Sequence, residues 1–203
     1  MVYLCVNGGQ GNRGLMEHWN FPEGRIPTVL CYANCPEVTL ELNGKEIGRK
    51  TLSEAVNGVL TWNIPYAPGT LKAIGRSGGK QLCEFALRTA GAAARVELIP
   101  DTKQLRADDK DICHVEFQIV DANGVRVPDA DAEVTFEVTG PARVLGIGNG
   151  DSNSVESTRD NVQRTFHGRG LMILQSTEDA GDVVVRSTVA GLEAGEVRVK
   201  CSK

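Results

Sequence analysis

The 203-residue sequence lacks several features that would point directly to a function. No apolar run approaches the roughly 18 residues that a membrane-spanning helix requires. Lysine and arginine total 22 against 26 acidic residues, so the net charge is −4 and the sequence has no polybasic stretch. Nucleic-acid binding usually depends on a basic surface. We therefore expect neither a membrane nor a nucleic acid among the partners.

Residues that catalyse reactions or bind metals are also scarce. The three histidines, His18, His114 and His167, lie far apart in the sequence, and no serine lies in a G-x-S-x-G elbow. No cysteines and histidines have zinc-finger spacing. The glycine-rich stretches at 8–11 and 146–150 lack the Lys-Ser/Thr ending of a phosphate-binding loop. We therefore predict no catalytic residue, no metal site and no cofactor in this chain.

The six cysteines have no spacing that fixes a disulfide pattern. They are Cys5, Cys31, Cys35, Cys83, Cys113 and Cys201. Residues four apart in a straight strand, such as Cys31 and Cys35, are separated by about 13 Å, which is too far for a disulfide. Cys113 and Cys201 occupy apolar positions of alternating segments. We expect mostly buried thiols, with one or more disulfides as the alternative.

Short alternating segments separated by turn residues dominate what is present. Val38, Leu40 and Leu42 alternate with polar residues, which predicts a half-buried strand. The Asn43-Gly44 pair that follows is typical of a two-residue hairpin, because both turn positions take positive φ. Turn signals recur about every 8–12 residues, and no segment has a sustained helical period. The predicted fold class is all-β: two consecutive antiparallel, immunoglobulin-like β-sandwich domains.

A stretch of small, uncharged residues at 89–94 divides the two sets of predicted strands. We therefore expect a first sandwich at 17–90 and a second, immunoglobulin-like sandwich at 91–203. Residues 1–16 form a segment of uncertain role. This segment lacks the basic start and long apolar stretch of a signal peptide, so we expect any export signal to lie elsewhere.

Several longer motifs resemble a known family. The strings HWNFPEG (18–24), YANCPEVTLELNGKEIG (32–48) and LTWNIPYAPGTLKAIG (60–75) resemble the domain that follows the catalytic barrel in many family 2 glycoside hydrolases, the β-galactosidase family. The region from Val96 to Ser157 and the string RTFHGRGLMILQS (164–176) resemble the immunoglobulin-like domain that comes next. The resemblance covers nearly the whole chain from about Glu17.

This resemblance implies a non-catalytic accessory region whose partner is the catalytic barrel of a parent enzyme. The family cleaves glycosidic bonds with two carboxylates about 5–5.5 Å apart in a barrel of about 250 residues. The chain is shorter than that, so none of its acidic residues is assigned such a role and we predict that it is inactive alone. The resemblance also suggests a periplasmic or secreted parent enzyme. An independent carbohydrate-binding module and a bacterial surface adhesion module are the alternatives.

Two groups of residues are candidates for ligand contact. His18, Trp19 and Phe21 could stack on a sugar, although a chain with 5% aromatic residues is expected to use its large rings for packing. Trp62 is expected in the core. The oxygen-rich loop with Asn149 and Asp151 suggests calcium, but calcium takes six to eight oxygen ligands. We expect a structural turn there, with a substrate-adjacent or interdomain loop as the alternative.

Overall fold

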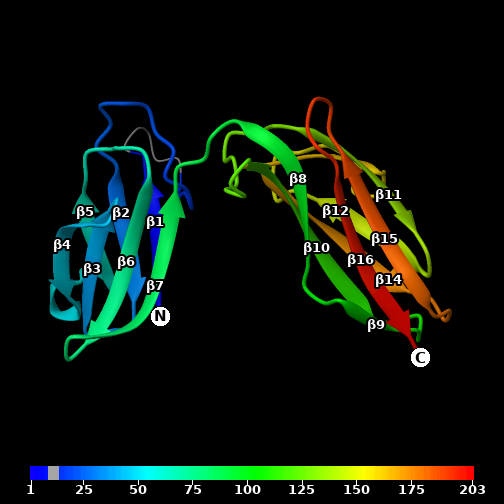
Figure 1. Ribbon diagram of the computed structural model, residues 1–203, viewed down its shortest axis with the longest axis horizontal. Coiled ribbons are helices and arrows are strands. Elements are labelled where there is room, and N and C mark those ends of the chain that lie inside the picture. The colour runs from blue at the N-terminus through cyan, green and yellow to red at the C-terminus, as the bar shows by residue number, and fades with distance from the viewer. Residues whose placement is uncertain (9–13) are drawn as a thin grey trace. The chain divides into compact units, whose positions relative to one another are not determined.

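The computed structural model describes residues 1–8 and 14–203 and divides the chain into two compact units, Met1–Thr89 and Ala90–Lys203 (Figure 1). Apart from a short 3₁₀ turn, η1 (Leu52–Glu54), the regular elements of this described part are strands. None of its helical segments is long and apolar enough to cross a membrane. The predicted all-β class with antiparallel sandwiches is confirmed. Residues 9–11 of the first glycine-rich stretch lie outside the described residues.

The first unit is a sandwich of two antiparallel sheets. The three-stranded sheet has the order β1–β2–β5, with bounds β1 (Val2–Asn7), β2 (Thr28–Ala33) and β5 (Val59–Asn63). The four-stranded sheet has the order β4–β3–β6–β7, with bounds β4 (Lys45–Thr51), β3 (Glu37–Leu42), β6 (Thr70–Ser77) and β7 (Lys80–Arg88). Their inner faces bury one apolar core, which includes Leu4, Val29, Leu60, Val38, Leu40 and Leu71.

The first unit begins earlier than the residue 17 that we expected. Strand β1 pairs with β2 along its whole length, from Val2 opposite Ala33 to Asn7 opposite Thr28. Leu4 and Val6 are fully buried in the core. The pairing joins segments more than twenty residues apart in the sequence, so no local turn signal predicts it. Part of the segment to which we assigned an uncertain role is therefore an integral strand of the sandwich.

The hairpin between β3 and β4 forms where the sequence predicts it. Asn43 and Gly44 have φ angles of 54° and 77°, as a turn with two left-handed positions requires. The Asn43 side chain also ties this turn to the start of β6. Its Oδ1 accepts a hydrogen bond from the Thr70 N–H at 2.8 Å, and its Nδ2 donates to the Pro68 carbonyl at 2.9 Å.

The second unit is also a sandwich of two sheets. The first has the order β12–β14–β10–β8, with bounds β12 (Ala142–Gly148), β14 (Arg169–Ser176), β10 (Ile112–Asp121) and β8 (Ala93–Pro100). The second has the order β13–β11–β15–β16–β9, with bounds β13 (Val162–Arg164), β11 (Glu133–Thr139), β15 (Gly181–Thr188), β16 (Gly195–Ser202) and β9 (Gln104–Arg106). Phe117 and Phe136 meet edge to face between the sheets, with ring centroids 4.9 Å apart.

Asp121 organises the turn that follows β10. Its Oδ1 accepts hydrogen bonds from the N–H groups of Asn123 and Val125, both at 2.9 Å. Its Oδ2 accepts a third from Gly91 at 2.8 Å, at the start of the second unit. The side chain is almost completely buried. Hydrogen bonds from three backbone N–H groups therefore replace those that the carboxylate would make to water.

All six cysteines are free thiols, and five of them are buried. Burial raises the pKa of Cys31 and of Cys113 to about 11 in each case. Cys113 and Cys201 lie in the core of the second unit, as the alternating pattern predicts. These buried thiols behave as small apolar side chains.

Candidate functional site

Trp19 is the centre of an aromatic cluster in the first unit. Its side chain is fully buried, and its Nε1 donates a hydrogen bond to the Ala67 carbonyl at 2.9 Å. The Phe21 and Tyr66 rings pack around it, with centroids 5.8 and 5.4 Å from the indole. The Thr89 hydroxyl donates to the Trp19 carbonyl at 2.6 Å. A buried indole has no free face for a sugar, so Trp19 acts here as a packing anchor.

His18 and Phe21, the other two contact candidates, lie at the edge of this cluster and are partly exposed. Their rings are 5.1 Å apart. The Nδ1 atom of His18 accepts a hydrogen bond from the Asn20 N–H at 3.2 Å, and its Nε2 lies 3.1 Å from the Met16 sulfur. Both ring nitrogens therefore have local contacts, and the ring packs against that of Phe21.

Trp62, which we expected in the core, is only partly buried. It packs against the core of the first unit, and the Lys50 ammonium lies 5.4 Å from the centroid of its ring. Gly48 lies against the indole, because a Cβ at this position would approach Nε1 to 2.6 Å. Trp62 thus packs against the edge strand β4 at Gly48, and its ring makes a cation–π contact with Lys50.

The Asn149 and Asp151 side chains stabilise the start of the loop that follows β12. Asn149 Oδ1 accepts a hydrogen bond from the Asp151 N–H at 2.9 Å, and Asp151 Oδ1 accepts one from the Asn153 N–H at 2.9 Å. Asn149 Nδ2 donates to the Arg164 carbonyl at 3.0 Å. Within the described ranges, 1–8 and 14–203, no three His, Cys, Asp or Glu side chains are grouped so as to hold a metal ion. These contacts describe a structural turn.

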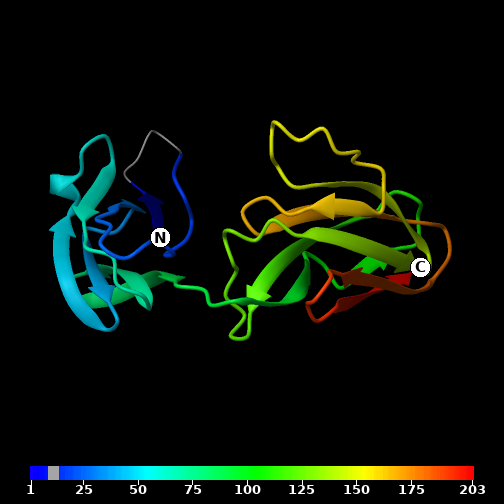
Figure 2. The same cartoon turned by 90° about the horizontal axis from the view of Figure 1, so that it is seen from above.

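Glu156 fixes the middle of the same loop, which projects from the second unit and is coloured yellow in Figure 2. Its carboxylate accepts hydrogen bonds from the Gln163 side-chain amide and from the Arg164 N–H, the latter at 3.1 Å. The Arg164 guanidinium lies 3.6 Å from the same carboxylate. Further along the loop, the Thr158 carbonyl accepts a hydrogen bond from the Ile147 N–H at 2.8 Å. Sequence reasoning did not assign this anchoring role to Glu156.

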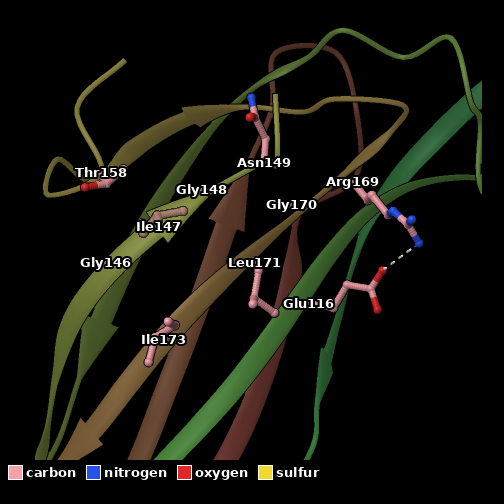
Figure 3. Close-up of a pocket in the computed structure, with 11 residues that line it drawn as sticks. Glu116, Gly146, Ile147, Gly148, Asn149, Thr158, Arg169, Gly170, Leu171 and Ile173 are labelled. Atoms are coloured by element: carbon pink, nitrogen blue, oxygen red, sulfur yellow. Dashed lines mark ion pairs between the residues drawn. The ribbon is translucent and has the colours of Figure 1, made fainter. Parts of the chain in front are cut away.

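An apolar groove lies on the outer face of β12 and β14, beside this loop (Figure 3). Gly146 pairs with Ile173, and Gly148 pairs with Leu171. Because the two glycines have no side chains, the isoleucine and the leucine have no cross-strand neighbours on β12. Leu171 is 41% exposed as a result. The groove has a volume of about 610 Å³, and Thr158 of the loop lines it as well.

One end of the groove is polar. Glu116 of β10 and Arg169 of β14 line it, and their charged groups are 3.9 Å apart (Figure 3). Glu116 also accepts a hydrogen bond from Gln118 at 2.9 Å. A mainly apolar groove with a neutralised charge pair at one end suits contact with another surface. The sequence signal that could have located it is the Gly-x-Gly spacing at 146–148.

A second, more polar depression has Asn149 and Asp151 in its lining. It has a volume of about 590 Å³, and its lining includes Asp131, Arg164 and Phe166. Arg164 pairs with Asp131 at 3.3 Å, so the charges of this lining are also partly neutralised. Asn149 therefore lines two depressions of different polarity.

Comparison with known proteins agrees with this all-β architecture and places it in a family. Residues 96–198, about half of the chain, match the family model described as glycoside hydrolase family 2 C-terminal domain 5. The chain belongs to glycoside hydrolase family 2, as part of its C-terminal region. Residues 24–83 of this family 2 region match a domain of unknown function, DUF4982.

Relatives of this family 2 region include enzymes of two specificities. The chain is 34% identical over 190 residues to a β-galactosidase, BoGH2A, from Bacteroides ovatus. This match covers 93% of this chain and 22% of that enzyme. It is 27% identical to a β-glucuronidase from Formosa agariphila, over 92% of this chain and 19% of that enzyme. The chain thus spans about a fifth of the length of the curated relatives it matches.

Solved structures give the same result. A glycosyl hydrolase family 2 member from Bacteroides cellulosilyticus has a TM-score of 0.85 at 30% identity, covering 98% of this chain and 28% of that one. A β-glycosidase from Bacteroides vulgatus has a TM-score of 0.86 at 28% identity, covering 98% of this chain and 24% of that one. Both structural matches include nearly all of the two sandwiches.

Proposed function

We propose that the two sandwiches support the catalytic barrel of a glycoside hydrolase that cleaves β-galactosides, with β-glucuronides as the alternative substrate class. One observation carries this proposal. A single stretch of 190 residues, covering 93% of this chain, matches 22% of a larger β-galactosidase. Both units therefore have counterparts in one polypeptide that includes much more than the two sandwiches.

The geometry of the groove supports a non-catalytic role. A retaining glycosidase needs two carboxyl groups about 5–5.5 Å apart, one of them protonated to act as the acid. Among the described residues that line the groove, Glu116 is the one acidic residue, and it is paired with Arg169. In the neighbouring loop, Asp151 and Glu156 accept hydrogen bonds from backbone N–H groups. These loop carboxylates stabilise the fold. Among the described residues that line the groove, no second carboxyl group lies beside Glu116.

The apolar groove is the surface that we propose for contact with another part of the enzyme. Leu171 is 41% exposed and Ile173 is partly exposed, because the residues that oppose them on β12 are glycines. Burying such side chains releases about 25 cal/mol for each Å² of apolar surface. A protruding apolar side chain of a neighbouring domain would lie over Gly148, beside the Leu171 side chain.

A chimeric enzyme tests the support role. The 190-residue stretch of the Bacteroides ovatus β-galactosidase that matches this chain would be replaced by the chain itself. We expect the chimera to keep galactosidase activity and thermal stability, and a deletion of the same stretch to lose both. A deletion variant that is as active and stable as the intact enzyme would contradict the proposal.

The groove is tested in the same chimera by Leu171→Arg. We expect a lower melting temperature, because a charge would be placed in an apolar contact. The matched control is Leu82→Arg, since Leu82 is another exposed strand leucine, 55% exposed, in the first unit. Equal effects of the two substitutions would exclude the groove as the contact surface.

The chain alone provides a direct test of inactivity. With chromogenic β-galactoside and β-glucuronide substrates, we expect no release of chromophore above the buffer rate. Turnover that survives repeated purification would show that this region has a catalytic site of its own.

Carbohydrate contact at His18 and Phe21 is a second candidate function. The observation that favours it is the gathering of His18, Phe21, Trp19 and Tyr66 in one cluster of a chain with few aromatic residues. Isothermal titration with galactosides should then give millimolar or tighter binding that Phe21→Ala abolishes. Absence of heat at millimolar sugar would exclude this candidate.

A further inference from the structure

Two cysteines that are distant in the sequence meet in the first unit. The sulfurs of Cys35 and Cys83 lie 3.5 Å apart, although the residues are 48 positions apart in the chain. Cys35 is in the connection between β2 and β3, and Cys83 is in β7. Sulfur atoms at this distance are in van der Waals contact, whereas a disulfide has an S–S bond of about 2.05 Å. The two sulfurs therefore need to approach by about 1.5 Å to form a bond.

Gly75 of β6 makes this meeting possible. Strand β6 lies between β3 and β7 in the sheet, and Gly75 pairs directly with Cys83. A Cβ at position 75 would lie 2.6 Å from the Cys35 sulfur and 2.8 Å from the Cys83 sulfur. Any larger residue would displace both thiols. Because Gly75 has no side chain, the sulfurs of Cys35 and Cys83 can both occupy the space beside β6 that a Cβ would fill.

The two thiols differ in access to solvent. Cys35 is 2% exposed, and Cys83 is partly exposed near the start of β7. Cys35 lies outside the regular strands, so small changes of its backbone and side-chain torsions can move its sulfur without breaking a sheet hydrogen bond. A soluble reagent would reach Cys83 first, and Cys35 is the thiol that lies beside it.

We propose that Cys35 and Cys83 form a disulfide by exchange with a small-molecule disulfide, and that this bond fastens the β2–β3 connection to β7. The Cys83 thiolate attacks one sulfur of the small disulfide and expels one thiolate. The Cys35 thiolate then attacks the Cys83 sulfur of this mixed disulfide and expels the second. The two protein thiols are oxidised, the small disulfide is reduced to two thiols, and two protons pass from the cysteines to the products.

Peptide mapping after treatment with oxidised glutathione tests the proposal directly. The whole chain would be oxidised under native conditions, unfolded, alkylated and digested without reductant. We expect one linked pair of peptides containing Cys35 and Cys83, two hydrogens lighter than their sum, and alkylation of the other four cysteines. Separate alkylation of Cys35 and Cys83 would overturn the proposal. A glutathione adduct on Cys83 that never resolves to the linked pair would overturn it as well.

Thermal unfolding gives a second measurement. Both tryptophans, Trp19 and Trp62, lie in the first unit, so their fluorescence reports on that unit alone. Closing a loop of this length should raise the melting temperature by roughly 5–15 °C on oxidation. Cys83→Ala should abolish the rise, and Cys201→Ala, in the core of the second unit, should keep it. An equal rise in the Cys83→Ala variant would contradict the proposal, and the peptide map of the unsubstituted chain decides the matter if a variant fails to fold.

Discussion

Gly170 lies directly against the ring of Phe117 in the core of the second unit. A Cβ atom at position 170 would approach Cζ of Phe117 to 2.1 Å, which is far inside van der Waals contact. Phe117 is fully buried, and its ring also packs against that of Phe136, so moving it would disturb a second core side chain. Glycine at this point of β14 is therefore a packing requirement.

Gly170→Ala should lower the free energy of unfolding of the second unit by about 1–3 kcal/mol, because the added methyl group overpacks the core. Urea denaturation followed by circular dichroism would measure the change. The double variant with Phe117→Leu should recover part of the loss, since the smaller side chain leaves room for the methyl group.

Gly148→Ala is the matched control for this prediction. Gly148 lies on the neighbouring strand β12. A Cβ atom at this position would have no other atom within 4 Å, so an added methyl group would clash with nothing. We expect a change between zero and a gain of about 1 kcal/mol, because alanine restricts the unfolded chain more than glycine does. A loss as large as that of Gly170→Ala would show that strand glycines are required for a reason other than packing.

Trp19→Ala should lower the free energy of unfolding of the first unit by about 3–5 kcal/mol, since it empties a fully buried site. Trp19→Phe should cost less, because a ring remains while the hydrogen bond to Ala67 is lost. Denaturation monitored by Trp62 fluorescence measures both variants. If Trp19→Ala cost no more than Phe21→Ala, the indole would not be the anchor of the cluster.

Asp121 makes the stability of the second unit depend on pH. The Gly91 N–H is the largest cause of the lowered pKa of this carboxyl; burial opposes the shift, and the Val125 and Asn123 N–H groups add to it. Because the folded pKa lies below the unfolded value of about 3.9, the stabilisation is complete above that value. It is lost as the pH falls through the folded pKa.

Denaturation at pH 7 and at pH 2–3 should therefore show that Asp121→Asn loses less stability on acidification than the unsubstituted chain. At pH 7 the variant should be less stable by about 1–3 kcal/mol, because an amide nitrogen cannot accept the Gly91 hydrogen bond. Parallel pH curves for the two proteins would show that another carboxylate dominates.

Glu156→Ala should loosen the loop at 150–161 without unfolding the sandwich. The substitution removes the acceptor for Gln163 and for the Arg164 N–H and leaves Gln163, which is 2% exposed, without this partner. Hydrogen exchange should become about tenfold faster in the loop and stay unchanged in β10 and β14. Glu178→Ala, at an exposed position outside this loop, is the control and should leave the loop unchanged.

Local signals in the sequence predicted the parts of the fold that local chemistry decides. The alternation at Val38–Leu42 and the Asn43-Gly44 turn gave the correct hairpin, because strand faces and left-handed turns depend on neighbouring residues. Strand β1 was missed because its partner β2 lies beyond a long connection. Trp62 was expected in the core, but it lies beside the edge strand β4 and is only partly covered.

The candidate site was less predictable for the same physical reason. The turn contacts of Asn149 and Asp151 join residues only two positions apart, so they depend on local sequence. The apolar groove depends on which residues of β14 oppose Gly146 and Gly148, and the contact of Cys35 with Cys83 depends on strand order. Registers between strands that are far apart in the sequence cannot be obtained from residue spacing alone.

The parallel pairing of β9 with β16 sets an order for folding during synthesis. Residues 104–106 hydrogen-bond to the strand at Gly195–Ser202, so this sheet edge stays open until that strand has left the ribosome. The first unit has all its strands once Arg88 has emerged. The N-terminal sandwich can thus fold while its neighbour is still being translated, and during that interval the nascent second sandwich has an unpaired strand edge, which is a site for non-native pairing.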